Sequence, residues 1–158
     1  MNITVRWESA LPVQQALMRQ GGIAADESKT LASLSQKDYV ITMLGFRMPA
    51  QGRNRYGSSD DQTTADNDRD RNSQSNDRLR SQFLDAAQLI PKNNHSIYAE
   101  DVQFEGPNGS GGIRFLFPRT NAISAGDKEV DFILDVRGVK VEHKFRLADM
   151  QYQGQLAL

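Results

Sequence analysis

The sequence contains no cysteine, and this absence excludes several classes of protein. Without a thiol, the chain can form no disulfide framework, no cysteine nucleophile and no cysteine-ligated zinc or iron–sulfur centre. The sequence also has no apolar run approaching the roughly 18 residues of a transmembrane helix, so we expect no membrane insertion.

Neither sign of charge predominates in the sequence. The 19 basic and 20 acidic residues give a formal net charge of -1. This balance excludes a global basic field for nucleic acids and a polybasic patch for membranes, so we expect a protein partner or self-association. The chain has 158 residues, 38% of them hydrophobic, which suits a single domain over 1–158 with a buried core.

The start of the chain bears on its compartment. It lacks the basic segment and following apolar segment of a signal peptide, and Ile3, Val5 and Trp7 alternate with polar residues instead. Two interpretations stay open. Either the chain is cytoplasmic, or a signal peptide has been removed, in which case an extracytoplasmic location is favoured.

The first half of the chain predicts both strands and helices. Residues 2–7 alternate as in a strand, and residues 38–46 are apolar on both faces, as in a central strand. Apolar residues at helical spacing predict helices over 9–20, 26–34 and 77–90, the last ended by the proline that follows it.

The last third of the chain is rich in strand patterns. Residues 102–104 and 113–117 flank a glycine-rich segment that we interpret as a hairpin loop, and a final strand is predicted toward the end of the chain. Residues 130–136 and 139–147 predict a hairpin with a turn at Gly138. Its register places three pairs of opposite charge across the strands: Asp135 with Lys140, Asp131 with Lys144, and Glu129 with Arg146.

These patterns together predict an α+β fold. The C-terminal half forms an antiparallel sheet or meander, and about three helices pack on one face of it. A polar segment rich in Asp, Asn and Arg, over 49–77, interrupts the pattern and is predicted to be a loop or insertion.

Alternating carboxylates within this segment resemble a calcium-binding loop. If Ca²⁺ binds, we expect its ligands to be Asp66, Asp68, Asp70, Asn72 and Asp77. The pattern departs from such loops because an arginine stands where a glycine makes the sharp turn. That departure favours a solvated loop of mixed charge, and an ion-pair cluster within the loop is a third interpretation.

No residue is assigned a catalytic or cofactor-binding role. The glycine loop at 106–112 lacks the Lys-Ser/Thr of a phosphate-binding loop and lies between two strands. Of the two histidines, His95 lies in a polar turn and His143 on the apolar face of a strand, where a structural role is favoured.

Four segments resemble small bacterial proteins of uncharacterised function, a group in which export is common. The resemblance extends over about half the chain, and the segments that carry it are residues 5–10, 113–119, 127–132 and 144–154. The resemblance implies an extracytoplasmic location and brings no activity, cofactor or catalytic residue with it.

Three functions remain open. The first is a non-enzymatic binding or interaction module, because loops on a rigid sheet are a usual place for recognition. The second is a self-assembling structural protein of a filament or surface that donates its terminal strands. The third is a polymer-acting hydrolase, which requires two carboxyl groups facing a cleft. Calcium stabilisation is compatible with all three.

Overall fold

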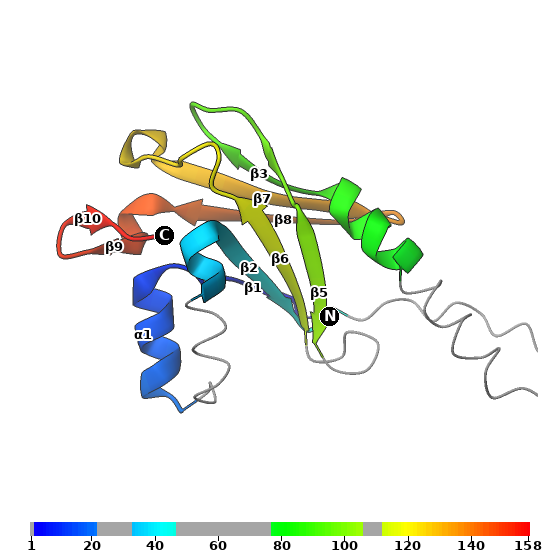
Figure 1. The fold of residues 1–158 in the computed structure, drawn as a ribbon, viewed down its shortest axis with the longest axis horizontal. Coiled ribbons are helices and arrows are strands. Elements are labelled where there is room, and N and C mark those ends of the chain that lie inside the picture. Colours follow the sequence, from blue (N-terminus) through cyan, green and yellow to red (C-terminus); the bar gives the residue numbers. More distant parts are fainter. Residues whose placement is uncertain (1, 22–32, 47–76, 106–111) are drawn as a thin grey trace, which may run out of the picture.

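A computed structural model describes residues 2–21, 33–46, 77–105 and 112–158. The fold is α+β and rich in antiparallel strands, as predicted (Figure 1). Within the described residues, helical structure occurs in α1 (Leu11–Arg19) and over 33–37 and 77–86, with 3-10 turns η2 (Ala125–Asp127) and η3 (Leu147–Met150). None of these helices is long and apolar enough to span a membrane.

The described strands form two four-stranded antiparallel sheets and a small hairpin. The first sheet has the order β1-β2-β6-β5, with bounds Thr4–Trp7, Asp38–Leu44, Gly112–Pro118 and Asp101–Glu105. The second sheet has the order β4-β3-β7-β8, with bounds Ile97–Tyr98, Ala87–Pro91, Glu129–Val136 and Val139–Arg146. The small hairpin pairs β9 (Gln151–Tyr152) with β10 (Gln155–Leu156).

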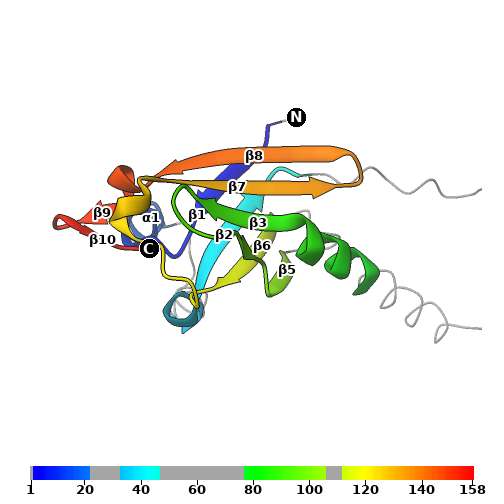
Figure 2. The same ribbon diagram turned by 90° about the horizontal axis from the view of Figure 1, so that it is seen from above.

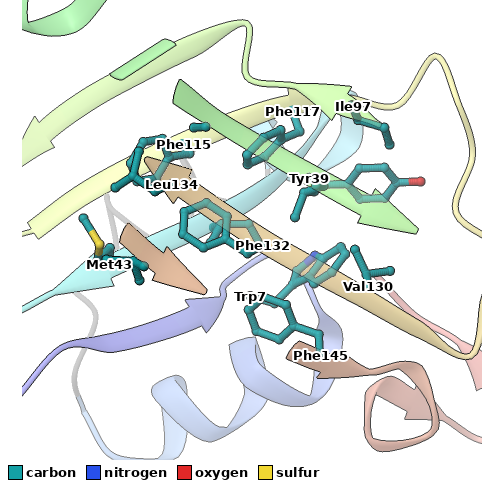
Figure 3. Packing of buried hydrophobic residues seen from close by; sticks show 14 of the residues in the cluster. Trp7, Tyr39, Met43, Ile97, Phe115, Phe117, Val130, Phe132, Leu134 and Phe145 are labelled. Atoms are coloured by element: carbon teal, nitrogen blue, oxygen red, sulfur yellow. The ribbon is translucent and has the colours of Figure 1, made fainter. Parts of the chain in front are cut away.

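The hydrophobic core lies between the two sheets (Figure 3). Phe132 of β7 packs against Phe115 and Phe117 of β6, with ring centroids 5.4 and 6.3 Å apart. Trp7 of β1 meets Phe145 of β8 at 5.1 Å. Because these rings come from opposite sheets, their contacts hold the sheets face to face.

The sandwich has one closed side and one open side. On the closed side the chain runs from β4 in one sheet to β5 in the other, with only residues 99–100 between them. On the open side the edge strands are β1 and β8, and Figure 2 shows β8 along the outer edge of its sheet. Among the described strands, β8 pairs only with β7.

The predicted β7–β8 hairpin is confirmed residue by residue. Its register places Asp135 opposite Lys140, Asp131 opposite Lys144 and Glu129 opposite Arg146. The turn residues Arg137 and Gly138 have φ angles of 52° and 77°. Two positive φ values define a type I′ turn, whose twist matches that of the flanking strands. The central position of β2, between β1 and β6, is confirmed as well.

The helix predicted over 77–90 is wrong in its second part. The helical residues end at 86, and β3 begins at Ala87. Ala87 and Leu89 are fully buried opposite Leu134 and Phe132 of β7. The apolar spacing of this short stretch fits either a helix or a strand, and pairing with β7 makes it a strand. Phe83, in the helical part, packs against the core ring of Phe115.

The single final strand predicted for the C-terminal end is also wrong. The chain makes the tight β9–β10 hairpin instead, with Gln153 and Gly154 at φ angles of 52° and 78°. Backbone bonds from Leu11 N to Ala157 O (3.0 Å) and from Ala157 N to Met150 O (3.1 Å) fix this end of the chain against α1 and η3.

Candidate functional site

The calcium ligands predicted from the sequence mostly lie outside the described residues. This applies to Asp66, Asp68, Asp70 and Asn72. Asp77 is described: it is exposed, and its carbonyl oxygen accepts a hydrogen bond from Ser81 Oγ at 3.0 Å. In the described part of the chain, no three acidic or histidine side chains gather as a metal site would require. The calcium site stays a prediction.

A cleft lies where the helical segment 77–86 approaches the β7–β8 turn. Its volume is about 310 Å³. Both elements supply its walls, which are formed by Gln82, Asp85, Ala86, Asp135, Val136 and Arg137. The Arg137 Nε–H donates to Gln82 Oε1 at 2.8 Å, so a side-chain hydrogen bond links the two walls.

The cleft brings two exposed carboxylates together from distant parts of the sequence. Neither Asp85 nor Asp135 makes an ion pair with another described residue. A hydrolase would need two carboxyl groups whose pKa values are set apart. Among the described residues, the carboxyl group whose pKa is raised is that of Asp38, and it does not line this cleft.

Asp38 is a buried acid at the start of β2, with an exposed fraction of 2%. Burial raises the pKa of its carboxyl group, and a side-chain hydrogen bond with the neighbouring acid Glu100 raises this pKa further. Glu100 is held in the β4–β5 link because its N–H donates to Leu116 O at 2.8 Å. Lys37 Nζ lies 3.3 Å from Glu100 Oε1 at the exposed edge of the pair.

Arg119 lies on the inner side of this acidic pair. Its guanidinium carbon is 4.5 Å from the centroid of the Tyr39 ring, and its Nη2 donates to Leu158 O. Burial lowers the pKa of Arg119, and the charge of Asp38 acts in the opposite direction. The Tyr39 hydroxyl accepts a hydrogen bond from Ile123 N at 2.9 Å. The cluster therefore joins β2, β6 and the C-terminal segment, and its acid is closed to a substrate.

We expect Asp38→Asn to stabilise the protein at pH 7. An acid whose pKa is raised in the folded state contributes stability that is present at low pH and is lost as the pH rises through that pKa. The amide carries no charge, so the variant should gain on the order of 1 kcal/mol at pH 7, the size of one hydrogen bond. The measurement is the free energy of unfolding in urea from about pH 3.5, below the ordinary pKa of an aspartate, up to pH 8.

The matched control for this measurement is Asp135→Asn, an exposed carboxylate on β7. A neutral substitution at an exposed position should change stability by less than about 0.5 kcal/mol. The raised pKa would be contradicted if the Asp38→Asn protein is less stable than the wild type at pH 7 and its stability falls as steeply as that of the wild type when the pH rises.

Large apolar side chains are exposed on α1 and on the C-terminal hairpin that contacts it. Leu11 and Met18 of α1 are 42% and 55% exposed, and Tyr152 of β9 is 39% exposed. Leu11 and Met18 are seven residues apart, so they lie on one face of the helix. Helix α1 contacts β9 and η3, and none of its residues is buried. We call Leu11, Met18 and Tyr152 the end patch.

His143 is on the core-facing side of β8 by register, as predicted, but its side chain is exposed. Its ring meets the Phe145 ring at 4.6 Å, and desolvation by the surrounding chain lowers its pKa. The imidazole is therefore neutral at pH 7.

No protein-family model, curated protein or solved structure matches the chain. The resemblance to exported bacterial proteins stays a prediction.

Proposed function

We propose that the chain is a non-enzymatic, protein-binding module that recognises its partner through the end patch. The observation that carries this proposal is the exposure of Leu11 and Met18 on one face of α1 and of Tyr152 in β9, a strand that contacts this helix. Apolar side chains gathered on a surface mark interaction sites more often than scattered ones do. Methionine and tyrosine suit such a surface, because one adapts its shape and the other offers a rigid ring with a polar tip.

The scaffold beneath the end patch supports recognition without rearrangement. The bond from Leu11 N to Ala157 O joins the start of α1 to the C-terminal segment. Leu147 and Met150 of η3 are buried, so the floor of this region belongs to the core. A pre-formed patch loses little conformational entropy on binding, which favours affinity. The partner expected here is a protein segment that presents apolar or aromatic side chains.

The test is a selection of random displayed peptides on the immobilised protein. We expect enriched peptides to share apolar or aromatic anchors. Their binding should weaken at least about tenfold for Met18→Lys, because a central apolar side chain of an interface contributes more than about 1 kcal/mol.

The control variant is Tyr98→Lys, since Tyr98 is also a large exposed apolar residue (61%) but lies in β4. Peptides that bind the wild type and Tyr98→Lys equally, and Met18→Lys poorly, would support the end patch. Peptides that do not distinguish Met18→Lys from the wild type would contradict it.

A further inference from the structure

The open edge of β8 carries a second interaction surface, independent of the end patch. The type I′ turn places Val136 opposite Val139, and this pair closes the turn with the hydrogen bond between its first and fourth residues. Hydrogen-bonded and non-hydrogen-bonded pairs alternate along an antiparallel ladder. The odd-numbered residues of β8 therefore bond to β7, and the N–H and C=O groups of its even-numbered residues point away from the sheet.

The side chains along this edge are accessible. Lys140, Glu142 and Lys144 have side chains that are 58%, 57% and 54% exposed. No described strand covers the outer side of β8, which runs along the margin of the sandwich in Figure 2. The residues facing the core from this strand, Val141 and Phe145, are nearly buried. No described residue bonds to the outward backbone groups of Lys140, Glu142 and Lys144, so an incoming strand can pair with them.

We propose that β8 pairs with β8 of a second copy of this chain, antiparallel and about a two-fold axis at His143. In this register Glu142 faces Lys144 of the other copy, and the reciprocal contact repeats the pair, so two intermolecular ion pairs flank the axis. Both residues have outward backbone groups, so the same positions form the hydrogen-bonded pairs. The two four-stranded sheets would join into one continuous sheet.

Charge complementarity and strand overlap together select this register. A two-fold axis at Val141 would also pair opposite charges, Lys140 with Glu142 of the other copy, but it would overlap only residues 139–143 of β8, whereas the axis at His143 overlaps residues 140–146. A two-fold axis at Glu142 would place Glu142 against its own copy and Lys140 against Lys144, and an axis at Lys144 would place that lysine against itself. The axis at His143 leaves one unfavourable contact, Lys140 with Arg146, at each end. Within one copy, Lys140 Nζ contacts Glu142 Oε1 and Lys144 Nζ lies 3.4 Å from Glu129 Oε2, so each exposed charge of the intermolecular pair is shared with a contact inside its own copy.

The centre of the contact suits two histidines. His143 has Phe132 opposite it in β7, and Val141 and Phe145 beside it on its own strand, so no charged group shares its face in the β7–β8 ladder. Its pKa is lowered, and two neutral rings can therefore meet at pH 7 without repulsion. Residues at a non-hydrogen-bonded antiparallel pair have Cα atoms about 4.5 Å apart.

Two experiments test the pairing. The first is analytical ultracentrifugation over a range of concentrations. We expect a monomer–dimer equilibrium whose dissociation constant rises at least tenfold in Glu142→Lys, and in Lys144→Glu, and is restored in the double exchange. Restored dimerisation in the double exchange would show that the single variants lost the intermolecular ion pair and not the fold.

The second experiment uses the absence of native cysteine. His143→Cys should form a disulfide-linked dimer under mild oxidation, because the two-fold axis places residue 143 opposite itself within disulfide distance. Lys140→Cys, on the same strand and equally exposed, should cross-link much more slowly. A wild type that stays monomeric at all concentrations overturns the proposal, and so does equal cross-linking at 143 and 140. A dimer that is lost in Met18→Lys but not in Glu142→Lys assigns self-association to the end patch and also overturns it.

Discussion

Replacing Phe132 by alanine is expected to destabilise the protein by about 3–5 kcal/mol, the range for a large aromatic side chain deleted from a core. Phe132 is fully buried, and its ring contacts Phe115 and Phe117 across the space between the sheets. Its strand is paired on both sides, with Leu89 in β3 and His143 in β8 as its neighbours. The surrounding backbone therefore has little freedom to fill the cavity.

The measurement is urea-induced unfolding followed by circular dichroism, with the slope of the transition compared between proteins. Natural domains have a total stability of about 5–15 kcal/mol, so the variant should be partly unfolded at low urea concentrations. Tyr98→Ala removes a ring of similar size from an exposed position and should change stability by less than about 0.5 kcal/mol. A loss below about 1 kcal/mol for Phe132→Ala would mean that the sheets do not meet at this ring.

Replacing Gly45 by alanine is expected to cost about 2–5 kcal/mol. Gly45 follows β2 with a φ of 77°, and a Cβ atom there would lie 2.3 Å from the backbone oxygen of Asn2. The left-handed conformation costs roughly 1–2 kcal/mol for a residue with a side chain. Displacing the segment before β1 adds about 1–3 kcal/mol, as overpacking does elsewhere.

Gly154 provides a matched control for this prediction. Its φ is 78°, but a Cβ atom there would meet nothing within 4 Å. Gly154→Ala should therefore show the conformational cost alone, and the difference between the two variants measures the close approach of Asn2. Equal losses of unfolding free energy in the two variants would contradict that contact.

The features that were predictable from the sequence are those set by neighbouring residues. The β7–β8 hairpin follows from two alternating segments joined by a glycine, and its apolar face fixes the register, because a slip of one residue would turn that face to water. The central strand β2 follows from apolar residues on both faces. Each of these patterns is complete within a short stretch of chain.

Features that depend on distant segments were not predictable in this way. The division into two sheets depends on β2 pairing with β6, and β3 is a strand because β7 lies beside it. The acidic pair joins Asp38 to Glu100, and the cleft joins Asp85 to Asp135. The sequence did contain one indication of the acidic pair. Asp38 is the first residue of a strand that is apolar on both faces, and an acid in that position is expected to be buried.

The strand order also sets the sequence of events during folding. The β7–β8 hairpin needs only local contacts, and such hairpins form in about 1–10 μs. The first sheet needs partners that are far apart in the chain. Glu8, next to β1, accepts a hydrogen bond from Arg114 of β6, which is 106 residues away. All-β domains with contacts of this kind fold in roughly milliseconds to seconds. The apolar face of the hairpin therefore stays uncovered for at least about a hundred times the time that the hairpin needs to form. We expect the chain to be most prone to aggregation during this interval.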